Sequence, residues 1–92
     1  MSEAARRTDG AAVTALVAEL RTYLAGISDG KLRAEEIEPA GHLFDAGYVD
    51  SLTAVMLVAH LEEAYGVRIE DMDLVERLTT LDALASHVAA ER

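Results

Sequence analysis

Gly47-Tyr48-Val49-Asp50-Ser51-Leu52 is the stretch that decides the fold, because it joins a glycine-containing loop to a long run of helix-forming residues. From Asp50 to Tyr65 there is no Gly or Pro, and Gly66 follows in the place of a helix C-terminal cap. Apolar residues in this run recur at helical spacing and predict one buried stripe: Ala54, Leu57, Val58, Leu61 and Tyr65. The sequence therefore predicts a helix that begins at Asp50 or Ser51.

Helical spacing also marks a first helix that ends at the turn Ser28-Asp29-Gly30. Its apolar face is formed by Val13, Leu16, Val17, Leu20, Leu24 and Ile27. A last helix, capped by Thr79 or Thr80 and ending near Glu91, is predicted to bury Leu81, Leu84, Ala85 and Val88. One or two helical turns at residues 71–77 complete an all-α fold of three main helices plus a short one.

Residues 29–50 form a long first loop that contains Pro39, Gly41 and Gly47. Long loops in compact domains are usually functional or disordered. Ile37, Leu43 and Phe44 offer apolar anchors, so we expect an ordered loop held on the core. Residues 1–9 lack periodicity and are predicted to be a flexible N-terminal tail, which leaves residues 10–92 as a single domain.

The chain carries a net charge of −9 and contains no Cys, which excludes disulfides, thiolate metal sites and a Cys nucleophile. Residues 34–50 contain acids and no base: Glu35, Glu36, Glu38, Asp45 and Asp50. Because nucleic acids and anionic lipids are bound by Lys and Arg, we expect neither as a partner. No apolar run approaches the roughly 18 residues of a membrane span. We expect a cytoplasmic monomer.

Ser51 is the first candidate for chemistry. At the start of a helix the backbone amides lack partners and the helix dipole favours negative charge, so a phosphodiester on the Ser51 hydroxyl would be stabilised there. The alternative is that Ser51 or Asp50 serves only as the helix N-cap.

A second apolar set lies beside the predicted core stripe and begins next to Ser51: Leu52, Val55, Met56 and Ala59. A helix in a small bundle needs only one apolar stripe, so this set is expected to be partly exposed and to mark an interaction site. Glu62 and Glu63 extend that face at its far end. The alternative is a helix that is buried on two sides.

The segment from Phe44 to Tyr65, with Asp50-Ser51-Leu52 and Leu61-Glu62-Glu63, resembles the acyl carrier protein family. The likeness continues in Leu78-Thr79-Thr80-Leu81, at the entry to that family's last helix. The resemblance implies a four-helix bundle without enzymatic activity. It also implies that a phosphopantetheinyl transferase moves 4'-phosphopantetheine from coenzyme A to Ser51, flanked by Asp50 and Leu52. Since the chain has no Cys, the thiol for thioester chemistry must come with this cofactor.

The resemblance further implies that the arm presents an acyl or aminoacyl group to loading and accepting enzymes with basic docking patches. Val55, Met56, Ala59, Glu62 and Glu63 are the expected docking residues. Fatty-acid carriers often have acids where this chain has Thr53 and Met56, and the Gly-Gly-His-Ser form of peptidyl carrier domains is absent. The Gly-x-x-Asp-Ser form resembles freestanding carriers, which indicates a polyketide, nonribosomal-peptide or related pathway. A housekeeping fatty-acid carrier and an acidic interaction module without an arm are the alternatives.

Other chemistry has little support in the sequence. His42, His60 and His87 do not form a metal-ligand spacing, so no metal site is expected. Ser51 lacks the strand and the second glycine of a Gly-x-Ser-x-Gly elbow. His60 lies more than two turns further along the same helix, beyond hydrogen-bond reach of Ser51. We therefore expect no catalytic residue.

Overall fold

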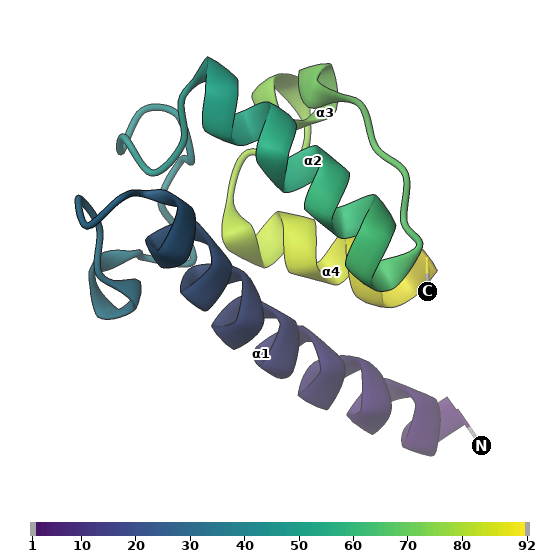
Figure 1. Ribbon diagram of the computed structural model, residues 1–92. Coiled ribbons are helices and arrows are strands. Elements are labelled where there is room, and N and C mark those ends of the chain that lie inside the picture. Colours follow the sequence, from purple (N-terminus) through teal and green to yellow (C-terminus); the bar gives the residue numbers. More distant parts are fainter. Residues whose placement is uncertain (1, 92) are drawn as a thin grey trace.

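The computed structural model describes the backbone of residues 2–91 and the side chains of residues 10–91. These residues form α1 (Ser2–Ile27), the 3-10 turn η1 (Ala34–Glu36), α2 (Ser51–Tyr65), α3 (Asp71–Glu76) and α4 (Leu81–Glu91) (Figure 1). No strand occurs within residues 2–91, and the predicted all-α class of three main helices and a short one is confirmed. Residues 2–9 of the predicted tail continue α1 in the backbone, and their side chains lie outside the described part.

The long helix α1 packs most extensively against α4, and α2 runs in the direction opposite to α1 and roughly along α4 (Figure 1). The extended segment 66–70 leads from α2 to the short α3, which lies beside α2. Gly66 ends α2 with a φ of 71°, and its amide donates to the Glu62 carbonyl at 3.0 Å. This left-handed conformation is the one that glycine adopts most easily at a helix C-terminus.

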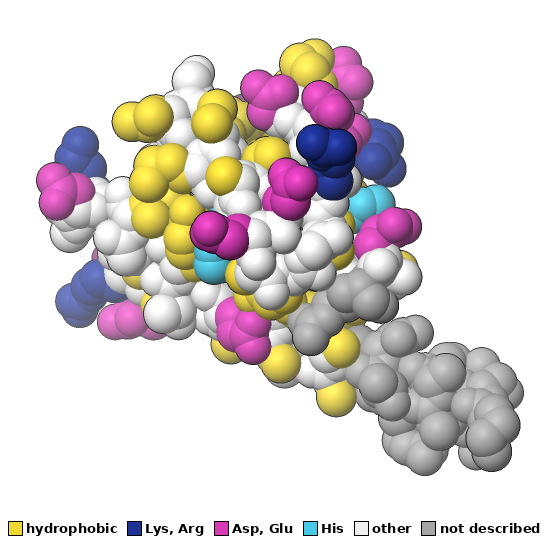
Figure 2. Space-filling model, turned by 45° about the vertical axis from the view of Figure 1, so that its right-hand side comes forward, with side chains coloured by type: hydrophobic (Ala, Val, Ile, Leu, Met, Phe, Trp, Pro, Cys, Tyr) yellow, Lys and Arg dark blue, Asp and Glu magenta, His cyan; other side chains and the backbone are white. Residues whose placement is uncertain are grey.

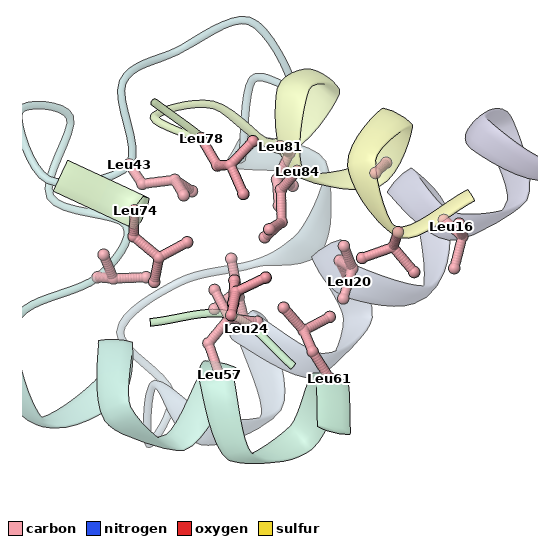
Figure 3. Close-up of a cluster of buried hydrophobic side chains, with 14 of the residues drawn as sticks. Leu16, Leu20, Leu24, Leu43, Leu57, Leu61, Leu74, Leu78, Leu81 and Leu84 are labelled. Carbon is pink, nitrogen blue, oxygen red and sulfur yellow. The ribbon is translucent and has the colours of Figure 1, made fainter. Parts of the chain in front are cut away.

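Leucine is the commonest residue of the core and is contributed by all four helices and by the loop, with Ile, Val and Ala filling the rest (Figure 3). The predicted stripe of α2 is confirmed, because Ala54, Leu57 and Leu61 are buried and Val58 and Tyr65 pack partly against them. Buried leucines of the four helices meet in Figure 3: Leu16, Leu20, Leu24, Leu57, Leu61, Leu74, Leu81 and Leu84. Within residues 10–91 no polar or charged residue is buried, so the described core itself is held by apolar packing.

One segment of the described chain, Gly10–Ile27 of α1, is long and apolar enough by length and composition alone to cross a membrane. Leu16, Leu20 and Leu24 of this segment are buried in the core. This finding differs from the expectation that no apolar run approaches the length of a span. Core helices of bundles can have the same composition, and α1 packs against α4, with 17% of the segment buried.

The first loop is ordered and fixed to the entry of α4, as its apolar anchors predicted. Ile37 and Leu43 are fully buried, and the Leu43 amide donates to the Thr79 carbonyl at 2.7 Å. His42 forms an isolated bridge with Thr80, whose hydroxyl accepts from the Ala83 amide at 3.1 Å and so caps α4. This arrangement places the end of the loop, and with it the start of α2, at a fixed position on the core.

Candidate functional site

The start of α2 is capped by Asp50 and not by Ser51. The Asp50 carboxylate accepts a hydrogen bond from the Thr53 amide at 2.9 Å, and the Thr53 hydroxyl accepts one from the Asp50 amide at 2.8 Å. This reciprocal pair is a capping box. Ser51 is therefore the first residue of the helix, it is exposed, and its hydroxyl makes no hydrogen bond to any described residue. The alternative that Ser51 is the N-cap is wrong.

Electrostatics at this helix start favour anions. The hydrogen bonds that Asp50 accepts, first from the Thr53 amide and then from the Thr53 hydroxyl, hold the pKa of its carboxyl below the ordinary 3.8. The amide of Ser51 belongs to the first turn, where backbone donors have no partner within the helix. A phosphate ester on the Ser51 hydroxyl would thus lie at the positive end of the α2 dipole while the cap stays intact.

The second apolar set of α2 lies on the surface. The exposed fractions are 69% for Leu52, 54% for Val55 and 37% for Met56, against 0% for Leu57. Ala59 is also exposed, and we call these residues, Leu52, Val55, Met56 and Ala59, the apolar strip. Figure 2 shows hydrophobic side chains gathered on one face, with acidic side chains and a histidine at the edge. The alternative of a helix buried on two sides is wrong.

Glu62 and Glu63 are exposed at the far end of the apolar strip, where the sequence places them. Glu62 lies 3.8 Å from the guanidinium of Arg68 in an exposed pair, and such pairs contribute little to stability. Both carboxylates are therefore available to a partner. The structure brings Ser51, the apolar strip and these two glutamates together on one side of α2.

Helix α3 adds exposed apolar side chains that sequence reasoning missed. Met72 and Val75 are 54% and 49% exposed, while Leu74 between them is fully buried. A groove of about 230 Å³ between α2 and α3 is lined by Val55, Val58, Ile69, Glu70 and Asp71. The signal in the sequence was the number of apolar residues in this short segment, because one six-residue helix cannot bury Met72, Leu74 and Val75 all on the same side.

The histidines take structural positions. The Nδ1 atom of His42 accepts hydrogen bonds from the amides of Phe44 and Asp45, both at 3.2 Å, and so shapes the loop. His60 stacks on Tyr23 of α1, with ring centroids 3.8 Å apart. Among the described residues no group of three or more His, Cys, Asp or Glu side chains could hold a metal ion.

With this geometry in place, the chain can be compared with known proteins. The sequence profile of the family described as the phosphopantetheine attachment site matches residues 12–88. An acyl carrier protein of Streptomyces coelicolor is 38% identical over 74 residues, which are 80% of this chain and 78% of that protein. The chain belongs to the acyl carrier protein family. No solved structure matches it.

As an acyl carrier, the protein bears covalently attached 4'-phosphopantetheine and is not an enzyme. It interacts with the enzymes that modify carriers and with those that handle acyl groups. The residues at the start of α2 fit such an arm, because the exposed Ser51 hydroxyl takes no part in the cap and the first turn tolerates a phosphate. When bound, the arm supplies the thiol that the Cys-free chain lacks.

Proposed function

We propose that Ser51 is the attachment residue of the arm, flanked by Asp50 and Leu52, and that a phosphopantetheinyl transferase is the enzyme that modifies it. The observation that supports this most directly is the position of Ser51, exposed at the first residue of α2 beside a cap that does not use it. The Ser51 oxygen would attack the phosphorus of coenzyme A that carries the pantetheine. A new P–O ester bond forms, adenosine 3',5'-bisphosphate leaves, and the hydroxyl proton passes to a base of the transferase or to water.

The other described serines fit this role less well. The Ser28 hydroxyl donates to the Ala25 carbonyl at 2.8 Å and accepts from the Leu32 amide at 2.9 Å, so it is occupied in the turn after α1. Ser86 is exposed but lies in the middle of α4, where backbone amides are already paired within the helix. Neither position offers the unpaired donors of a helix start.

The apolar strip is proposed to be the docking face for loading and accepting enzymes. Interfaces concentrate their binding energy in a few desolvated apolar anchors, and rim charges act mainly on the association rate. Val55, Met56 and Ala59 supply the anchors, whereas Glu62 and Glu63 would meet basic residues of the partner. A net charge of −9 opposes self-association, so we propose a monomer in the cytoplasm.

We propose that the cargo is an acyl or aminoacyl group of a polyketide, nonribosomal-peptide or related pathway. This rests on the sequence of α2, where Thr53 and Met56 stand in place of the acids that fatty-acid carriers often have there. In the structure Thr53 is committed to the cap and Met56 to the apolar strip. The holo-protein should then accept malonyl poorly from the malonyl transferase of a fatty-acid pathway, and efficient loading would favour a housekeeping carrier instead.

The attachment proposal is tested by intact mass after incubation with coenzyme A and a broad-specificity phosphopantetheinyl transferase. The wild type should gain one phosphopantetheine, Ser51→Ala should gain none, and Ser86→Ala should behave as the wild type. A wild type that gains no mass would favour an acidic interaction module without an arm. Modification that persists on Ser51→Ala would show that another residue carries the arm.

A further inference from the structure

Two tyrosines and a histidine clamp α1 to α2. The Tyr23 hydroxyl of α1 donates to the Met56 carbonyl of α2 at 3.1 Å, and the Tyr65 hydroxyl of α2 donates to the Glu19 carboxylate of α1 at 2.6 Å. His60 lies between them, stacked on Tyr23 with an interplanar angle of 8° and edge-on to Tyr65 at 5.8 Å. The described part of the chain therefore joins its two longest helices through aromatic rings as well as through leucines.

The Tyr23 end of this clamp borders the apolar strip. Its hydroxyl is bonded to the backbone of Met56, a member of the strip, and the rings of Tyr23 and His60 are only partly buried. Burial, and after it the nearby Glu63 carboxylate, raises the pKa of Tyr23 above the ordinary 10.0. Apolar side chains, two aromatic rings and a carboxylate thus form one continuous surface that crosses from α2 onto α1.

An enzyme that acts on the Ser51 hydroxyl must cover the N-terminal half of α2. A standard interface buries about 800 Å² on each partner, which corresponds to a patch with a radius of about 16 Å. At a rise of about 1.5 Å per residue, Met56 lies about 8 Å and His60 about 14 Å along the helix from Ser51, whereas Tyr65 lies about 21 Å away. By distance along the helix axis alone, the Tyr23 end of the clamp falls within the radius of such a patch, and Tyr65 falls beyond it.

We propose that Tyr23 and His60 form the α1-side edge of the surface that docks the phosphopantetheinyl transferase, which meets them with a basic rim. This proposal rests on the proposed function of Ser51. Tyr side chains provide a rigid apolar body with a polar tip and are enriched among residues that dominate binding energy. Glu63 beside Tyr23 gives this edge a negative charge, so basic residues of the enzyme would complement it.

The first test compares two tyrosines of the same clamp. Tyr23→Ser and Tyr65→Ser each remove a ring and a hydroxyl hydrogen bond between α1 and α2, so both should lower the melting temperature. Modification rates are measured by intact mass with a broad-specificity transferase and coenzyme A. We expect Tyr23→Ser to raise KM about tenfold with little change in kcat, as loss of one substantial contact would. Tyr65→Ser should leave KM within about twofold of the wild type.

Equal KM values for the two variants would show that Tyr23 acts only on stability, and a wild-type KM for Tyr23→Ser would show that the enzyme does not touch α1. Either result overturns the proposal while Ser51 is still modified. Failure of the proposed function is distinct, because the wild type would then gain no mass or Ser51→Ala would still gain it.

The second test needs no variant. The wild-type apo-protein is titrated with the transferase in the absence of coenzyme A, and amide and ring resonances are followed by NMR. Chemical-shift changes on addition of the transferase are expected at Tyr23, His60 and the apolar strip but not at Tyr65. Perturbations confined to α2 and the exposed α3 residues Met72 and Val75 would place the enzyme on the opposite side of α2 and overturn the proposal.

Discussion

The Asp50 carboxylate and the Thr53 amide are joined by a 2.9 Å hydrogen bond that caps α2, and Ser51 lies between them without taking part. The residue that caps the helix and the residue proposed to carry the arm are thus neighbours with separate roles. A modified Ser51 can keep the helix start intact, because the donors and acceptors of the cap belong to other residues.

This separation predicts different effects of substitution at the two neighbouring positions. Ser51→Ala should change the free energy of unfolding by no more than about 0.5 kcal/mol, as is usual for exposed residues without partners. Asp50→Ala should lower the melting temperature clearly further, because the Thr53 amide loses its acceptor. Thermal melting of both apo-proteins checks this. A larger loss for Ser51→Ala than for Asp50→Ala would mean that Ser51 contributes to the cap.

Acid should destabilise the protein through two aspartates at helix starts: Asp50, the N-cap of α2, and Asp73, which accepts a hydrogen bond from the Glu70 amide at the start of α3. The pKa of Asp50 is lowered first by the Thr53 amide, and the pKa of Asp73 first by the Glu70 amide. A carboxyl whose folded pKa is depressed stabilises the fold above its ordinary pKa of 3.8, and this contribution is lost as the pH falls through the folded value. Stability should therefore fall steadily below about pH 5.

The substitutions Asp50→Asn and Asp73→Asn test this dependence, because they keep an acceptor but remove the titrating group. Urea unfolding is measured between pH 6 and pH 2.5, about the range over which such groups titrate. For each variant the free energy of unfolding should fall less steeply with decreasing pH than for the wild type. Asp82→Asn, at an exposed position in the first turn of α4, is the matched control. An unchanged slope in both Asp50→Asn and Asp73→Asn would show that other carboxyls govern the acid response.

Salt should stabilise the protein. The net charge is −9, and acids crowd the loop at residues 34–50 and the segment 70–76. Screening with a Debye length of about 10 Å at 0.1 M weakens this repulsion, so the melting temperature should rise with NaCl and rise more per mole with MgCl₂. At equal ionic strength the two salts should nearly coincide, since the described residues hold no cluster for a metal. A flat melting temperature would show that the acids are well separated.

Much of the fold could be predicted because it follows from local periodicity. The spacing of Ala54, Leu57 and Leu61 predicted the buried stripe. The threonines before an apolar run predicted a cap at Thr79 or Thr80, and the structure shows that it is Thr80. The same periodicity left Leu52, Val55 and Met56 outside the stripe, and they are exposed. These features depend on residues that are close together in the chain.

The features that the sequence did not predict depend on contacts between distant segments. The stack of Tyr23 on His60 joins α1 to α2 across 37 positions, and no periodicity relates the two residues. The Nδ1 atom of His42 accepts hydrogen bonds from two backbone amides of the loop, and the sequence does not show which way this atom points. The turn η1 is too short to show a helical pattern. The choice of Asp50 over Ser51 as cap also required backbone geometry.

Adjacent residues of α2 should respond in opposite ways to the same substitution. Met56→Glu places a carboxylate on the surface, so the melting temperature should hardly change, whereas transfer of cargo to a cognate partner should weaken by about 1–3 kcal/mol. Leu57→Glu places the same group in the leucine core and should unfold the domain, because an unpaired buried charge is very costly. Thermal melting and a loading assay separate the two effects. If both variants melt alike, the apolar strip belongs to the core.

The cap formed by Asp50 and Thr53 also bears on how the protein could be used. Because the Ser51 side chain makes no hydrogen bond to any described residue, what is attached there can vary without altering the helix that presents it. Coenzyme A derivatives that carry a fluorophore, a biotin or a spin label in place of the natural thiol should be accepted at the same oxygen. Fused to another protein, residues 10–91 would then serve as a tag that places one reporter at one defined atom, with the reporter's position set by α2.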